Sequence, residues 1–221
     1  MKWWRYILVA GVVALGIGYV YLHRQDLGLV GGPRGADASP DSTTGREVAV
    51  RPAPINWQAV NRPNKGFKLE MPANPQEIQI PAYNENGGSE PVNMIFSNPD
   101  GGTSFAVAWA DNPPVARANH RAASQVLTAA RDGALERTQT SLSNETNSSP
   151  GGIPVRNMLT HNAGGGVMDS RLMYAGNRLY MLIAVFPSRG ARREQDVARF
   201  FNSFAVRGST ALPQASAPLG N

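Results

Sequence analysis

The order of apolar and polar positions predicts a domain that begins with strands. Phe67, Leu69 and Met71 alternate with charged residues, which is typical of a strand with one face in water. Similar patterns predict three more strands, near 78–80, 92–97 and 103–110. A hairpin signal at Asn98–Gly102 separates the last two, so neighbouring strands are expected to run antiparallel.

A helix is predicted over Ala116–Gln139, because apolar residues recur there at helical spacing. Its inward positions are Ala123, Val126, Leu127, Ala130 and Ala134. These side chains are mostly small, so the helix is expected to pack close to the sheet. The following segment, Asn144–Gly152, is rich in Asn, Ser and Gly and is predicted to be a polar loop.

Three further strands are predicted in the second half of the domain, over Ile153–Thr160, Val167–Tyr174 and Arg178–Phe186, with the last two joined at Gly176–Asn177. Residues 179–186 are apolar at every position, which favours a central strand covered on both faces. A short amphipathic helix ending near Phe204 completes the domain. The pattern therefore predicts the α+β class, with an antiparallel sheet flanked by helices.

Several short motifs mark the C-terminal third of the chain: Arg171–Tyr174, Asn177–Tyr180, Pro187, Asp196-Val197 and Arg199–Phe204. Together they resemble the ending of PsbP-like domains and of uncharacterised bacterial envelope proteins with the same pattern. The resemblance implies an α/β/α sandwich built on an antiparallel sheet. It also implies work by binding and assembly, as in the extrinsic photosystem subunits of plants. It assigns no functional residue to this chain.

Residues 1–24 are predicted to be a membrane anchor. Lys2 and Arg5 precede seventeen uncharged residues, 6–22, and Arg24 follows them. At about 1.5 Å per residue, such a helix nearly crosses a hydrocarbon core of about 30 Å. The positive charge before the run favours a cytoplasmic N-terminus and an extracytoplasmic domain, in a bacterial periplasm or at a cell surface. The alternative is a signal peptide cleaved after Ala36-Asp37-Ala38.

The rest of the chain divides into a linker, one domain and a tail. Residues 25–54 are rich in Gly, Pro, Ser, Asp and Thr without apolar periodicity, residues 208–221 have the same character, and both segments are predicted to be disordered. The domain is predicted over 55–207. It holds 15 Lys and Arg against 12 Asp and Glu, with no basic run, and such a small excess does not indicate nucleic-acid binding.

No residue is predicted to be catalytic, to bind a metal or to bind a cofactor. The chain has no cysteine, which excludes thiolate chemistry and Cys-based metal sites. His120 and His161 lack partners at metal-ligand or catalytic spacing. Gly164-Gly165-Gly166 is interpreted as a hairpin turn, because no helix or Lys follows it. Asp169 and Arg171 are interpreted as a solvated stripe on one strand.

Four arginines near the last loop and helix form the one candidate contact surface, here called the arginine patch: Arg189, Arg192, Arg193 and Arg199. Clustered guanidinium groups can bind the carboxylates of an acidic partner or anionic headgroups. The leading hypothesis is a membrane-anchored, non-catalytic binding or assembly module with a protein partner in the cell envelope.

Two alternatives remain open. The first is a small-ligand or lipid-binding domain, with an apolar pocket between the sheet and the alanine-faced helix, lined by Phe105, Trp109 and Met173. The second is an enzyme, such as a hydrolase. A cleft that joins His120 or His161 to a serine and a carboxylate would favour it.

Overall fold

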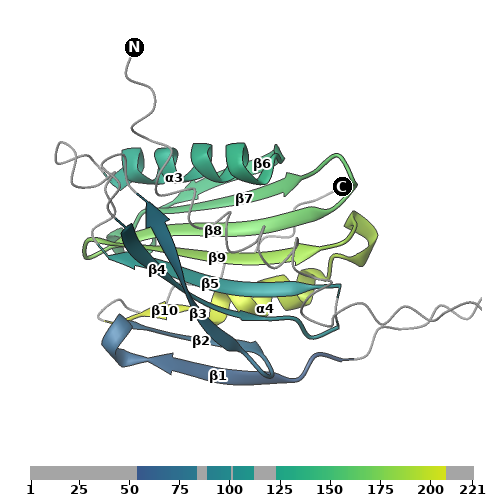
Figure 1. Ribbon diagram of the computed structural model, residues 1–221, viewed down its shortest axis with the longest axis horizontal. Helices are drawn as coiled ribbons and strands as arrows, with labels where there is room; N and C mark the ends of the chain where they lie inside the picture. The colour runs from purple at the N-terminus through teal and green to yellow at the C-terminus, as the bar shows by residue number, and fades with distance from the viewer. Residues whose placement is uncertain (1–53, 84–88, 101, 112–122, 208–221) are drawn as a thin grey trace, which may run out of the picture.

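The computed structural model describes residues 54–83, 89–100, 102–111 and 123–207, without the side chains of 80–83 and 89–90 (Figure 1). The predicted anchor, the predicted tail and nearly all of the predicted linker lie outside these ranges, as do His120 and the predicted start of the first helix. Among the described residues, no helix has both the length and the apolar character needed to span a membrane.

The larger of two sheets has seven strands, and every neighbouring pair is antiparallel. From edge to edge they are β3 (Gln76–Tyr83), β4 (Ser89–Ser97), β5 (Ser104–Asp111), β9 (Arg178–Phe186), β8 (Val167–Ala175), β7 (Val155–His161) and β6 (Ser141–Ser148). The fully apolar strand β9 lies at the centre of this order, as its sequence predicts.

The smaller sheet contains β1 (Trp57–Arg62), β2 (Phe67–Pro72) and β10 (Ala205–Val206), with β2 in the middle. Two α-helices are described, α3 (Ala123–Thr138) and α4 (Glu194–Ser203). In the described part of the chain, three single 3-10 turns connect elements: η2 (Pro63–Lys65), η3 (Pro150–Gly152) and η4 (Arg189–Ala191).

Helix α3 covers one face of the seven-stranded sheet (Figure 1). Its buried residues are Val126, Leu127, Ala129, Ala130, Gly133 and Ala134. They pack on methionines and other apolar side chains of the strands, including Met158, Leu172 and Met181. Small side chains let a helix approach a sheet closely, so the close packing predicted from the alanine-rich face is confirmed.

The opposite face is covered by the three-stranded sheet together with α4 (Figure 1). This core is aromatic, and the rings meet mostly edge to face: Trp57 and Phe105, Phe67 and Tyr180, Phe105 and Phe200. Such pairs stabilise a core by about 0.5–1.5 kcal/mol beyond the burial of their area.

The predicted fold class is therefore confirmed only in part. The antiparallel sheet is present and both of its faces are covered. However, one cover is a second sheet with a helix, so the described chain is mostly β and is not a sheet flanked simply by helices. The predicted hairpin at Gly176–Asn177 is confirmed, with positive φ angles of 55° and 63° that suit the twist of a two-residue turn.

The main correction concerns Asn144–Gly152, which is not simply a polar loop. Residues 141–148 form strand β6, which pairs with β7 and is exposed at seven of its eight positions. Neither of its faces is apolar, so there is no alternation to reveal a strand, and Asn and Ser are otherwise common in turns. Strand β1 was also not predicted, because its side chains do not alternate cleanly.

Candidate functional site

The arginine patch lies on η4, on α4 and in the residues between them, at one end of the aromatic core. Arg189 and Arg199 are exposed, whereas Arg192 and Arg193 are half-buried. Arg189 forms no ion pair with any residue that the structure describes. The other three are paired with acidic residues of the same chain.

Arg192 forms the most buried of these pairs. Its Nε and Nη2 donate to the two carboxylate oxygens of Asp169 on β8, at 2.7 and 2.8 Å. Asp169 is only 6% exposed, so the prediction that it lies on a solvated stripe is wrong. The hydrogen bonds and charge of Asp169, aided by Glu194, outweigh burial and raise the pKa of Arg192 above its usual value. Arg192 therefore fastens the chain before α4 to the sheet.

Arg193 and Arg199 fasten α4 in the same way. Arg193 Nη2 lies 2.8 Å from Asp100 Oδ2 in the β4–β5 turn, and its Nε lies 3.0 Å from Asp196. Arg199 Nε donates to Glu70 Oε2 at 2.6 Å and its guanidinium stacks over the ring of Trp57. Three members of the arginine patch thus have a structural role in this chain.

Arg171 was grouped with Asp169 in the sequence, and it too is turned inward. Its Nε donates to Asn157 Oδ1 at 2.7 Å and its Nη1 donates to the carbonyl of Phe201 at 2.8 Å. No carboxylate of the described residues pairs with it, and burial lowers its pKa to about 10. A cation on the last turn of a helix is favoured by the helix dipole, so Arg171 holds the C-terminal end of α4.

Strand β6 is the feature that the sequence did not predict and that most resembles a contact surface. It is the last strand of the larger sheet, and among the described residues no strand pairs with its outer edge. Eight residues make a long edge strand, and within it Glu145 is the only charged residue, with no Pro or Lys. Natural edges are commonly blunted by charge, by proline or by shortness. Here only a register shift between Leu142 and Asn144 interrupts the edge.

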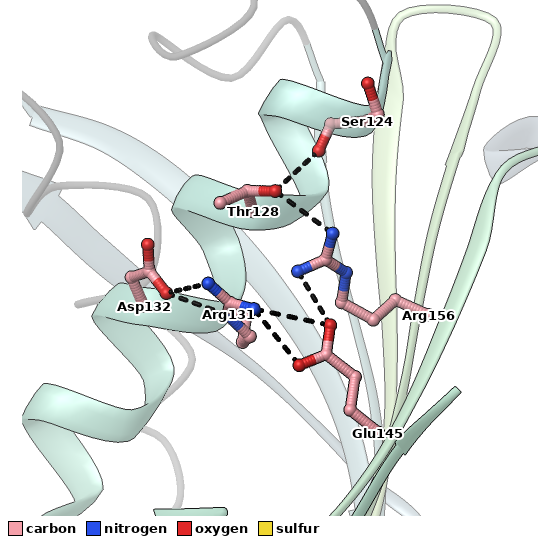
Figure 2. Close-up of polar contacts among 6 residues, drawn as sticks. All are labelled: Ser124, Thr128, Arg131, Asp132, Glu145 and Arg156. Carbon is pink, nitrogen blue, oxygen red and sulfur yellow. Dashed lines mark hydrogen bonds and ion pairs between the residues drawn. The ribbon is translucent and has the colours of Figure 1, made fainter. Parts of the chain in front are cut away.

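The carboxylate of Glu145 points toward Arg131 on α3 and Arg156 on the neighbouring strand β7 (Figure 2). Its carboxylate accepts a hydrogen bond from Arg131 Nη1 on α3 at 3.1 Å and lies 2.9 Å from Arg156 Nη1 on β7. Arg156 Nη2 also donates to Thr128 Oγ1 on α3 at 3.0 Å. We call Glu145, Arg131, Arg156 and Thr128 the Glu145 clamp. It joins the edge strand, its neighbour and the helix above them.

The clamp is a partly buried ionic network. Arg156 is 7% exposed, and its Nε has no hydrogen-bond partner among the described residues. Its Nη1 is close enough to Glu145 for an ion pair but is not aligned for a hydrogen bond. Arg156 therefore depends on the charge of Glu145. For Arg131, the partners Asp132 and Glu145 outweigh the effect of burial and raise the pKa.

At the register shift, Ser143 and His161 meet. The distance between Ser143 Oγ and His161 Nδ1 is 2.8 Å, and both residues are exposed. In serine hydrolases the serine bonds to Nε2 while an acid orients Nδ1, whereas here the serine occupies Nδ1. No group of three or more His, Asp and Glu suited to a metal occurs among the described residues. This pair alone does not make the cleft that the hydrolase hypothesis needs.

The opposite edge of the sheet, β3, is built differently. Pro81 of β3 lies directly opposite Pro91 of β4. Because neither proline can donate a hydrogen bond, the two fit a non-hydrogen-bonded pair, in which each backbone nitrogen points away from the other strand. Pro81 then removes a donor from the outer edge of β3. Glu77 of the same strand forms an exposed ion pair with Arg62 of β1 at 2.9 Å.

The predicted ligand pocket is not found where it was expected. Phe105, Trp109 and Met173 all belong to the aromatic core on the face away from α3. Each is at most 1% exposed, and Phe67 packs against Trp109 with ring centroids 5.1 Å apart. These residues therefore fill a core and do not line a cavity beneath the alanine-faced helix.

Comparison with known proteins gives only weak structural similarities. No protein-family model matches the chain, and no curated protein matches it. Among solved structures it is similar to PsbP of the cyanobacterium Synechocystis, with 11% identity, a TM-score of 0.48 and coverage of 76% of this chain and 99% of that one. It is also similar to the Pseudomonas aeruginosa protein PA94 of unknown function, with 12% identity, a TM-score of 0.33 and coverage of 61% and 85%. The weak PsbP-like resemblance of the sequence is matched by this weak structural similarity, and neither likeness assigns a role to the chain.

Proposed function

We propose that this protein is a membrane-tethered, non-catalytic assembly module that binds a protein partner along the outer edge of β6. The observation that supports this function is the edge itself, which is long, exposed and nearly uncharged, with its one carboxylate held inward by the Glu145 clamp. An extended strand of a partner would add to the sheet through backbone hydrogen bonds, which supply affinity in this mode of recognition.

The clamp suits such a surface, because a strand must be held straight and in register before another can pair with it. Ion pairs from β6 to both α3 and β7 fix the edge segment Asn144–Ser148 against the body of the domain. A surface that is already ordered loses less conformational entropy when it binds.

The predicted anchor and linker would determine where this surface works. A spacer of about thirty residues, at roughly 5–6 Å times the square root of its length, allows the domain to explore about 30 Å around its anchor. We propose an extracytoplasmic location in a bacterial envelope, where this range suits the capture of a neighbour in the same membrane.

The arginine patch is a second candidate contact surface, reduced by the structure to its exposed members. Arg189 and Arg199 can reach an acidic partner or anionic headgroups, although Arg199 already bonds to Glu70. Arg192 and Arg193 are unsuitable for a mutational test of binding. Replacing Arg192 would leave the buried Asp169 without its ion pair, and replacing Arg193 would loosen the β4–β5 turn.

The test is a crosslinking pulldown of the full-length protein from its native membrane. Three forms are compared: the wild type, an edge variant with Asn144→Lys and Thr146→Lys, and a patch variant with Arg189→Ser and Arg199→Ser. A matched control carries Gln125→Lys and Gln195→Lys, which add the same charge to exposed positions of α3 and α4.

We expect a stoichiometric partner with the wild type and the control, and its loss from the edge variant alone. Loss from the patch variant instead would move the contact surface to the arginines and contradict the role of β6. Equal recovery from all four forms would contradict both surfaces, and circular dichroism of each variant would show that the fold is retained.

A further inference from the structure

We propose that the partner strand of β6 is β6 of a second copy of this chain, antiparallel to the first and related to it by a two-fold axis at Thr146. This inference rests on the proposed function, and it adds the identity and the register of the partner. It would make the protein a closed dimer with one continuous sheet across the two copies.

The two edges of the sheet determine which pairing is possible. A copy that added its β3 edge to β6 would present a new free β6 edge, and repetition of that contact would give an open filament. Pro81 disfavours this contact, because it removes a backbone donor from the outer side of β3. Pairing β6 with β6 uses the same surface on both copies, so the assembly ends at two.

The geometry of an antiparallel pair limits the register. Two directly opposed residues either both hydrogen-bond across the pair or both do not. Along each strand, hydrogen-bonded and non-hydrogen-bonded positions alternate. In a two-fold pair the residue at the axis must therefore face its own copy. A centre at Ser148 would place Asn147 opposite Ser149, beyond the end of β6, so the centres left within the edge segment are Asn144, Glu145, Thr146 and Asn147.

The side chains favour the centre at Thr146. Thr146 then faces Thr146 of the partner, which is a favourable cross-strand pair. Glu145 faces Asn147 of the partner, and Asn144 faces Ser148, so every pair is small or polar and no like charges meet. All of these residues except Glu145 are exposed and available.

The other centres are less favourable. A centre at Glu145 places two carboxylates directly opposite each other, which destabilises a pair of strands. A centre at Asn144 places Thr146 opposite Leu142, across the register shift that interrupts the regular strand between Leu142 and Asn144. A centre at Asn147 pairs Glu145 with Ser149, which lies beyond the end of β6.

The absence of cysteine from the chain allows a direct test in the full-length protein. In Thr146→Cys, each chain carries one thiol, and opposed residues in an antiparallel pair have Cβ atoms about 4.5–5.5 Å apart. This separation is close to the range that a disulfide needs, so mild oxidation in detergent micelles should crosslink most of the protein into dimers. Gln125→Cys and Gln195→Cys, on exposed helix positions, are the matched controls and should remain monomeric on a non-reducing gel.

A second arm tests the register. Asn144→Cys and Ser148→Cys should each crosslink poorly alone, because residues four positions apart along a strand are about 13 Å apart. Mixed in equal amounts, these two variants should form a heterodimer, since 144 faces 148 across the axis. Light scattering of the unmodified protein should give the mass of two chains.

A disulfide at Thr146 with the mixed 144–148 product confirms both the partner and the register. Efficient crosslinking of Asn144→Cys alone or of Asn147→Cys alone would instead overturn the register. A monomeric wild type, with no crosslink at any β6 position, would overturn self-pairing. The proposed function would still hold after that result if the membrane pulldown recovers a different protein with the wild type but not with the β6 edge variant. It would fail as well if recovery of every partner is independent of β6.

Discussion

The two edges of the seven-stranded sheet present opposite solutions to the same problem. Strand β3 carries Pro81 and an exposed ion pair between Glu77 and Arg62. Strand β6 has no proline, and its single charge is directed into the Glu145 clamp. The first edge has lost a backbone donor and displays charge. The second edge retains its backbone groups and turns its charge away from the side where a strand would add.

This difference shows that edge strands cannot be judged by polarity alone. Among the described side chains Leu142 is the only large hydrophobic residue that is exposed, so a scan for apolar patches would find neither edge. What separates the edges is the direction in which charge and backbone donors point. The predictions below test that distinction.

The largest expected effect is a loss of stability when the charged residue of an edge strand is neutralised. Glu145→Gln would leave Arg156 buried without an anion, so we expect the free energy of unfolding to fall by about 3 kcal/mol. Glu77→Gln, at the other edge, should cost no more than about 0.5 kcal/mol, since its pair is exposed. Urea unfolding of the two variants measures both values. Equal losses would show that the clamp is no stronger than a surface ion pair.

A somewhat smaller effect is expected when charge is added to the open edge. Thr146→Lys places two ammonium groups opposite each other in the proposed dimer, so self-association should weaken roughly tenfold, as like charges across an interface oppose binding. Sedimentation velocity over a dilution series measures this change. Gln125→Lys is the control and should dimerise like the wild type; a Thr146→Lys protein that does the same would contradict pairing at this strand.

Restoring the backbone N–H that Pro81 removes from the β3 edge should change self-association less. Pro81→Thr returns one backbone N–H to β3, and one hydrogen bond stabilises a contact by about 1 kcal/mol. We expect species larger than the dimer to appear in light scattering at high concentration. These species would form by β3–β6 contacts that compete with the β6–β6 dimer, so adding Thr146→Lys to this variant should remove them by charging the β6 edge. Larger species that persist in the double variant would point to another surface.

The smallest expected effect concerns the β4–β5 turn, which is away from both edges. Burial would raise the pKa of Asp100, but hydrogen bonds from Thr103 and Gly102 and the charge of Arg193 lower it below its usual value. The ionised form therefore contributes stability above its unfolded pKa near 3.8, and this contribution is lost as the pH falls through the lower folded value.

We expect Asp100→Asn to reduce the free energy of unfolding by about 0.5 kcal/mol at pH 6, and we expect a smaller difference from the wild type at an acidic pH below the unfolded pKa near 3.8. Thermal unfolding at the two pH values measures it. Self-association should not change. If it did, then loosening of the sheet, and not the chemistry of an edge, would explain the other variants.

The elements that the sequence predicts well are those marked by a run or a regular spacing of apolar residues. Strand β9 is apolar at nearly every position, and its place between β5 and β8 follows from that run. The apolar positions of α3, except the half-buried Ala123 at its start, and the phenylalanines of α4 recur at helical spacing and are buried as expected. In each case, burial of apolar surface decides the structure, and burial leaves a periodic trace.

The candidate site leaves no such trace. Strand β6 is held by a register with β7 and by ion pairs to α3, and both depend on residues far away in the sequence. The arginine patch was visible in the sequence, but its partners Asp169, Asp100 and Glu70 were not, because spacing along the chain does not show which carboxylate a guanidinium meets. Whether the exposed members bind a partner stays a prediction.

The position of β2 also bears on how the chain folds during synthesis. Strand β2 lies between β1 and β10, and the N–H of Glu70 donates to Ser203 Oγ, 133 residues further along the chain. Phe67 of β2 stacks on Phe204, next to the end of α4. The β1–β2 hairpin therefore cannot complete its apolar contacts until nearly the whole domain has been made, although Phe105 and Trp109 of β5 can meet it earlier. Such distant contacts form slowly, and the incomplete chain is exposed to aggregation or to capture by chaperones while it waits.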